Sequence, residues 1–222
     1  MAISIITDFT NVTTFNGWTV IPFPLSPGFK SIEFTANDNV AQVAQPWTQQ
    51  SQFQAWPGGD WWEGTITLPK MQRAQAAQWI AFLMSARGMA NCFMIGDPTM
   101  RHPQGNPQGV PLVDGSNSSN NGVMTSVLVT KGWTPNVRAL LMPGDYVQVG
   151  LRMHVVLNMV NSDTNGSSTL QLWPSLREKP VDGLQLICSN VKGLFRLASN
   201  KRTWGVDETR LFGLSFKISE AK

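Results

Sequence analysis

Few side chains in this sequence have the chemistry of a catalyst or of a metal ligand. The two histidines are His102, in a Pro- and Gly-rich stretch, and His154, in the alternating run RMHVVLNMV. Neither has a cysteine or a carboxylate beside it at the spacing that zinc sites use. A single histidine in such a run is more often a core or surface residue than a ligand. The sequence therefore predicts no metal site and no cofactor.

Several acidic residues lie within two positions of Gly, Pro or Asn, which are typical turn neighbours. They are Asp60, Asp97, Asp114, Asp145, Asp163 and Asp182. A glycosidase needs two carboxylates roughly 5–10 Å apart in a cleft, and the sequence marks no such pair. Gly-x-Ser-x-Gly is absent, and GNPQG lacks the lysine of a phosphate-binding loop. We expect a binding or structural protein, not an enzyme.

Tryptophan carries the strongest functional signal. Four tryptophans fall within QPWTQQSQFQAWPGGDWW, among glutamines. An exposed row of this kind suits stacking on sugars and equally suits a subunit interface. Only 14% of the residues are charged, against about 25% in a typical soluble domain, and this favours the interface. The predicted interface residues are Trp47, Trp56 and Trp61.

Charge and cysteine content limit the other classes. The net charge is +3 and the basic residues are spread along the chain, so the sequence gives thin support for nucleic-acid binding. Cys92 and Cys188 are expected to be buried free thiols, although the sequence leaves a disulfide open. The N-terminus lacks the pattern of a signal peptide, and no run is long enough to span a membrane. We expect synthesis in a cytoplasm and no membrane insertion.

The elements that must position these side chains are mainly strands. WWEGTITL alternates as a half-buried strand does, and GLSFKISE alternates at the C-terminal end and is expected to close the sheet that begins near the N-terminus. Pro69 and Gly88 delimit one long apolar helix, predicted over residues 69–87. The predicted core of this module consists of Trp62, Ile66, Leu68, Trp79, Phe82 and Leu83.

Between these segments the texture changes. Residues 99–122 are rich in Pro, Gly, Asn and Ser and are predicted to form an irregular loop. Short strands with turn signals follow and predict a small barrel or sandwich. The sequence therefore predicts a mainly β protein with two modules. Residues 1–97 and 189–222 would form a β-sandwich with the helix, and residues 98–188 an inserted loop and small β-barrel.

Four segments of the sequence resemble a known family. WEGTITLPKMQRAQAAQWIAFLMSARGMANCFMIGDP, followed by LMPGDYVQVG, DTNGSSTLQLWPSLREKPVDG and GLFRLA, is similar to the distal tail proteins of long-tailed bacteriophages. These are the tail-tip ring or baseplate hub proteins. The resemblance implies a β-sandwich that assembles into a ring, with an inserted barrel of the oligonucleotide/oligosaccharide-binding type. It carries over no catalytic residues.

The function implied by the resemblance is structural. The chain would form a homo-oligomeric ring in the virion, at the distal end of the phage tail, after synthesis in the host bacterial cytoplasm. A hexamer is expected, with a trimer left open. The ring would join the tail tube protein to tip and receptor-binding proteins, and DNA would only pass through its channel. The alternative is a carbohydrate-binding module or adhesin that uses exposed tryptophans on host glycans.

Overall fold

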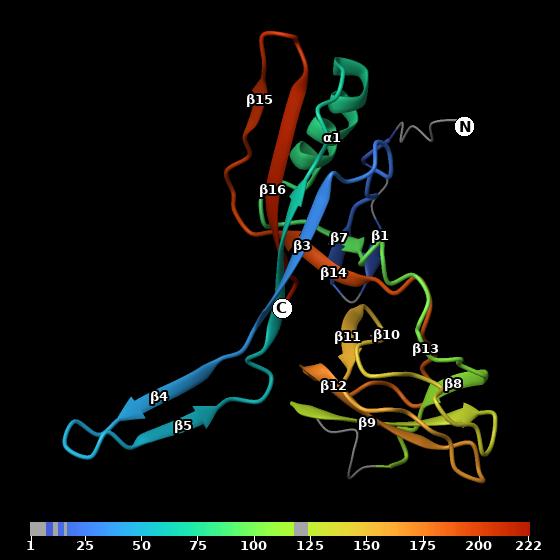
Figure 1. Ribbon diagram of the computed structural model, residues 1–222. Helices are drawn as coiled ribbons and strands as arrows, with labels where there is room; N and C mark the ends of the chain where they lie inside the picture. Colours follow the sequence, from blue (N-terminus) through green and yellow to red (C-terminus); the bar gives the residue numbers. More distant parts are fainter. Residues whose placement is uncertain (1–7, 11–12, 16, 118–123) are drawn as a thin grey trace. The chain divides into compact units, whose positions relative to one another are not determined.

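The computed structural model describes residues 8–10, 13–15, 17–117 and 124–222. This part of the chain is mainly β, with a single helix and several sheets, one of which is a nearly closed barrel-like sheet (Figure 1). Residues 1–7, on which the expectation about a signal peptide partly rests, lie outside the described residues.

The chain divides into two compact units, each assembled from separated stretches of sequence. Unit 1 contains residues 1–35, 62–95 and 193–222, and unit 2 contains residues 36–61 and 96–192. The predicted modules had placed residues 36–61 with the helix. Side chains of residues 36–61 instead form hydrogen bonds with the barrel of unit 2, as described below. These bonds join residues more than a hundred positions apart in the sequence.

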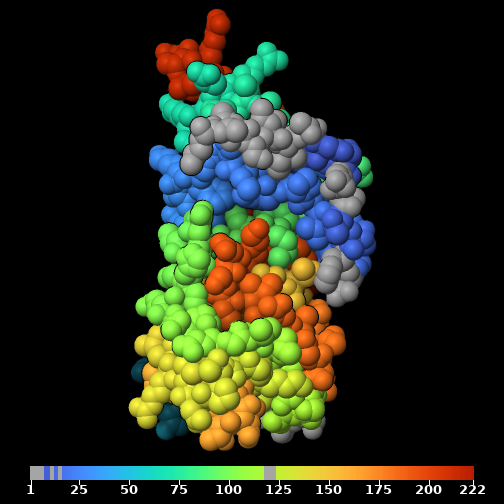
Figure 2. Space-filling view, turned by 90° about the vertical axis from the view of Figure 1, so that its right-hand side faces the viewer, coloured from blue at the N-terminus to red at the C-terminus, as the bar shows by residue number. Residues whose placement is uncertain are grey.

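Unit 1 is organised by one eight-stranded sheet. Its strand order is β1-β2-β7-β14-β16-β6-β3, with β15 paired to β16. The strands are β1 (Thr13–Phe15), β2 (Trp18–Val20), β3 (Ser31–Asn37), β6 (Trp61–Thr67), β7 (Cys92–Ile95), β14 (Gly193–Leu197), β15 (Trp204–Val206) and β16 (Phe212–Glu220). The predicted C-terminal strand, β16, therefore lies in the sheet that begins near the N-terminus. In Figure 2 the tip of its hairpin with β15, in red, projects beyond α1, in teal.

The helix is shorter than predicted: α1 spans Arg73–Ser85, not residues 69–87. Met71 forms a bridge with Phe212, exchanging N–H···O=C bonds of 3.1 and 2.9 Å. This pairing holds the backbone of Met71 extended, so the helix cannot begin before Gln72. At the other end, Arg87 and Gly88 both adopt positive φ and stop the helix.

The helix packs on the sheet through aromatic side chains. Phe82 of α1 lies 5.1 Å from Phe93 of β7, and Trp79 and Phe82 each lie 6.2 Å from Phe216 of β16, measured between ring centroids. Phe23 adds a ring 5.4 Å from Trp79. All six predicted core residues are buried in this unit: Trp62, Ile66, Leu68, Trp79, Phe82 and Leu83.

Unit 2 contains a six-stranded sheet in the order β13-β10-β11-β12-β9-β8. The strands are β8 (Gly109–Val113), β9 (Thr125–Trp133), β10 (Tyr146–Val149), β11 (Arg152–Val156), β12 (Ser168–Leu176) and β13 (Leu186–Ile187). The two end strands approach each other, because Val113 N–H donates to Leu184 C=O at 2.8 Å and Leu112 bridges Gln185. These bonds nearly close the barrel.

Strand β8 lies where an irregular loop was predicted. Leu112 and Val113 pair with Lys131 and Thr130 of β9, and Val113 is fully buried. Pro111 within GVPLV obscured the strand, because proline is confined to edge strands and bulges. The register shift between Gly109 and Leu112 is such an irregularity. The predicted loop residues 118–122 lie outside the described residues.

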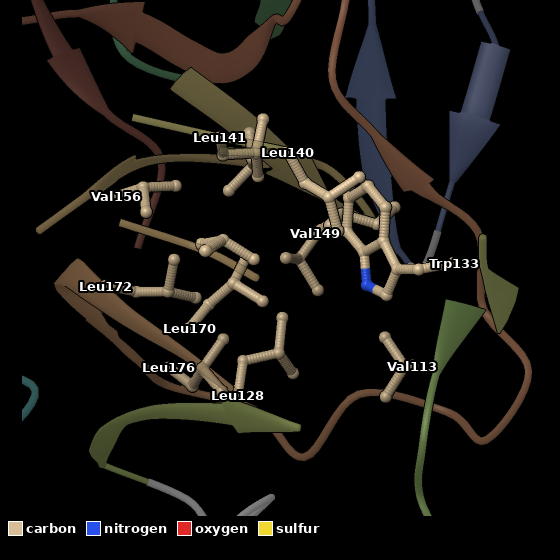
Figure 3. Close-up of a cluster of buried hydrophobic side chains, with 13 residues drawn as sticks. Val113, Leu128, Trp133, Leu140, Leu141, Val149, Val156, Leu170, Leu172 and Leu176 are labelled. Carbon is tan, nitrogen blue, oxygen red and sulfur yellow. The ribbon is translucent and has the colours of Figure 1, made fainter. Parts of the chain in front are cut away.

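The barrel encloses its own apolar core, to which each of its six strands contributes at least one buried side chain (Figure 3). Trp133 is oriented within it by a hydrogen bond of 2.8 Å from Nε1 to the Thr130 hydroxyl. The buried cluster comprises Val113, Leu128, Trp133, Leu140, Leu141, Val147, Val149, Val156, Val160, Leu170, Leu172, Leu176 and Leu186.

Candidate functional site

A two-stranded hairpin in unit 2 contains two of the three predicted interface tryptophans. Strands β4 (Val40–Ala44) and β5 (Ser51–Ala55) pair in register from Val40↔Ala55 to Ala44↔Ser51. A four-residue turn closes the ribbon. Gln45 and Gln50 are joined by a bond of 2.9 Å, and Gln49 takes the left-handed conformation that the turn needs (Figure 1). Pro46 at the start of the turn prevents β4 from continuing.

No charged residue occurs between Asp38 and Asp60, although every side chain from Gln42 to Pro57 is exposed. We call residues 39–59 the uncharged hairpin. The register places Val40 and Phe53 on one face and Val43 and Trp56 on the other. Phe53 is 68% exposed and Val43 66% exposed, so both faces present apolar groups. Ribbons of two strands are at best marginally stable alone in water.

The tryptophans do not form one row. Trp47 lies in the turn and is 90% exposed, whereas Trp56 lies at the base, opposite Asn39, and is 46% exposed. Five residue pairs separate them, or about 17 Å along the strands. Trp61 begins β6, is half-buried and alternates with buried Trp62, as the sequence pattern predicted. The hairpin therefore carries tryptophan at its two ends.

Two aspartates fix the base of the uncharged hairpin to strand β12. Trp173 Nε1 donates to Asp38 Oδ1 at 2.8 Å. Asp60 is 8% exposed, and its Oδ2 accepts from the backbone N–H of Ser175 and from the Ser175 hydroxyl at 3.0 Å. The guanidinium of Arg177 donates to the Asp60 carbonyl. The hairpin strands thus leave the barrel from a fixed base.

This anchor was not predicted from the sequence. Asp60 was assigned to turn chemistry, yet it is buried and bonds a residue 115 positions away. Asp145 was assigned in the same way, but it is 1% exposed and accepts bonds from Gln104, Gly105 and Met142 backbone N–H groups. A carboxylate beside glycine is typical of a turn, and the local sequence contains nothing to mark the distant partner.

His154 lies in the same region of the barrel, on β11, and is fully buried. Its Nδ1 is 2.7 Å from the Pro174 carbonyl, which can only accept, so Nδ1 carries the proton. Nε2 has no hydrogen-bond partner among the described residues. Burial, together with the positive charges of Arg152 and Arg177, lowers the pKa of His154 to about 4. His154 is therefore a neutral core residue at neutral pH.

The two cysteines and His102 are further residues with reactive side chains. Cys92 and Cys188 are free. Burial raises the pKa of the Cys92 thiol and raises that of Cys188 to about 12, so neither is a ready nucleophile. His102 is exposed. Within the described ranges, no three His, Cys, Asp or Glu side chains are grouped so that they would hold a metal ion.

Neither the protein-family models nor the curated proteins contain a match to this chain. Among the described residues, α1 falls short of the length and apolar character that crossing a membrane requires.

Proposed function

We propose that this chain is a structural protein of a phage tail tip, that it assembles into a ring, and that the uncharged hairpin is one of its subunit contacts. The observation that supports this proposal is that a long ribbon without charged residues is exposed on both of its faces. Free surfaces are normally rich in charge, and exposed strand edges are normally protected by charges or prolines. The hairpin has the composition of a covered surface.

The absence of charge has an energetic consequence for assembly. Burying an unpaired charge costs much free energy, whereas burying glutamine costs little when its hydrogen bonds are satisfied, and burying alanine, valine and aromatic side chains is favourable. A ring is closed by a head-to-tail contact between two different surfaces. In this proposal the hairpin of one subunit provides the first surface, and its neighbour provides the second.

The two units take separate roles in the proposal. Unit 1 would be the β-sandwich of the ring, and the barrel of unit 2 the inserted module of the oligonucleotide/oligosaccharide-binding type. The ring, with six subunits, would join the tail tube protein to tip and receptor-binding proteins in the virion. The work of such a protein is assembly, and it uses no catalytic residue and no cofactor.

The test compares assembly of matched variants. Light scattering across a concentration series, with negative-stain images, is expected to show closed rings of fixed subunit number for the unaltered chain. Val43→Lys with Phe53→Lys places one charge on each hairpin face and is expected to abolish them. The control, Val110→Lys with Val181→Lys, alters residues that are 58% and 73% exposed elsewhere in unit 2 and should leave rings intact. Rings that survive the hairpin change would overturn the assignment.

One observation favours a second function. Trp47 is 90% exposed at the tip of the hairpin, between Pro46 and Thr48 and close to several glutamines, as a sugar-stacking residue would be. A carbohydrate-binding module would show a saturable change in tryptophan fluorescence with oligosaccharides. Trp47→Ala would remove that change, while Trp204→Ala, at a residue 37% exposed in unit 1, would retain it.

A further inference from the structure

Strand β16 pairs with β15 in its first part and with β14 in its last part, and a cleft lies between the two pairings. Leu197 of β14 pairs with Ile218, whereas Trp204 of β15 pairs with Leu214. The edge of β16 between these pairs, at Ser215 and Phe216, faces neither strand. The loop of residues 198–203 passes around this gap, and with α1 it encloses a cleft of about 340 Å³.

Three hydrogen bonds hold the loop in place. Ala198 N–H donates to Lys217 C=O at 3.0 Å. Asn200 Oδ1 accepts from the Met89 N–H at 3.2 Å, and Arg202 Nη1 donates to the Leu83 carbonyl in the last turn of α1 at 3.2 Å. A side chain at Gly88 would collide with Asn200, since its Cβ would lie 2.4 Å from that Oδ1. The cleft is therefore a formed feature of unit 1.

The cleft combines an apolar floor with a cationic rim. Leu83 and Leu197 are buried beneath it, and Phe216 is half-buried. Lys201, Arg202 and Lys217 line its rim, and no carboxylate is among the described residues that line it. None of these cations forms an ion pair with a carboxylate that the structure describes. Hydroxyl groups of Thr65, Ser199, Thr203 and Ser215 complete the lining.

We propose that this cleft is a docking site for an acidic segment of a partner polypeptide, one that carries an apolar side chain between its carboxylates. The floor would bury the apolar side chain, and the rim would pair with the carboxylates, so both halves of the cleft are used. A nucleic-acid strand needs cations spaced along a path of phosphates. Here the three cations line a single cleft of about 340 Å³. The proposal does not depend on ring formation.

The experiment measures fluorescence anisotropy with three labelled peptides of equal length. One alternates Glu with Leu, one alternates Gln with Leu, and one alternates Glu with Gly. The full chain is expected to bind the Glu–Leu peptide saturably and to bind each of the others at least about tenfold more weakly, because each lacks one half of the complement. Equal binding of all three peptides, or no saturable binding of the first, overturns the proposal.

Matched variants place the binding at this cleft. Lys201→Gln with Lys217→Gln is expected to weaken binding of the Glu–Leu peptide about tenfold. Lys179→Gln with Lys192→Gln removes the same charge from exposed positions in unit 2 and should leave binding unchanged. Equal loss in both double variants would reveal a general charge effect. Tighter binding of single-stranded oligothymidylate, or displacement of the peptide by inorganic phosphate, would assign the cleft to another anion. Each of these outcomes contradicts the proposal.

Discussion

At the scale of single residues, Asp60 does the most to fix the candidate interface. Its buried carboxylate satisfies both the N–H and the hydroxyl of Ser175. Asp60→Ala leaves these donors without an acceptor and is expected to lower the free energy of unfolding by about 2 kcal/mol. Urea unfolding measures this. Asp97→Ala is the matched control, since Asp97 makes the same pair of bonds to Thr99 in an exposed loop. Equal effects of the two changes would refute the anchoring role.

His154 links the same region to pH. In the folded chain its pKa is about 4, whereas an unfolded histidine titrates near 6.5. Between these values the unfolded chain binds a proton that the native chain does not. The contribution of neutral His154 to the free energy of unfolding is therefore fully present above pH 6.5 and is lost as the pH falls towards 4. The loss attributable to this group is about 3 kcal/mol over the window.

The measurement is urea unfolding at a series of pH values from neutral to acidic. His154→Asn keeps an amide near the position of Nδ1, to bond the Pro174 carbonyl, and removes the titration. Its stability should depend less steeply on pH than that of the unaltered chain. His102→Asn, at the exposed histidine, should follow the unaltered chain. Parallel pH profiles for all three proteins would show that His154 does not titrate as described.

At the scale of elements, the uncharged hairpin should add little to the stability of the fold, because both of its faces are exposed. Ala41 and Gln54 are directly paired, so an Asn-Gly turn can replace the residues between them. The shortened chain keeps Asp38, Trp56 and Asp60. Its free energy of unfolding should change by less than about 1 kcal/mol, while its capacity to form rings should be lost. A large loss in urea unfolding would mean that the hairpin packs against the fold.

The elements also show what the sequence can and cannot predict. Strand β6 was predictable because one face is buried, and its alternation appears directly as Trp62, Ile66 and Leu68. The helix was predictable in kind, but its start was not, since that depends on a bridge between Met71 and Phe212. Alternation in the hairpin gave no sign that both of its faces would be exposed.

The least predictable features depend on contacts between distant segments. The bond from Asp60 to Ser175 joins positions that are 115 residues apart. The cleft beside Phe216 exists only because β16 has β15 as its neighbour at Leu214 and β14 at Ile218. Local patterns of Lys, Ser and Phe gave no indication of it. Periodicity predicts which residues are buried, whereas tertiary pairing determines which polar groups meet.

At the scale of the whole molecule, each of the two units has an apolar core of its own within the part of the chain that the structure describes. One is the aromatic cluster around Phe82 in unit 1, and the other is the barrel cluster around Leu170 in unit 2. The chain passes between the units within strands β3 and β6 and again near Gly96 and Lys192. Each unit therefore has the core of a domain even though neither is a continuous stretch of sequence.

Two cores predict two calorimetric unfolding transitions. Phe82→Ala and Leu170→Ala each empty a site that is fully buried, and each should cost about 3 kcal/mol. Each substitution is expected to lower the midpoint of one transition and to leave the other in place, because the cavity lies in only one core. Leu25→Ala, at a residue that is 78% exposed, should move neither. A single transition that both core substitutions lower equally would show instead that the strands passing between the units make them unfold together.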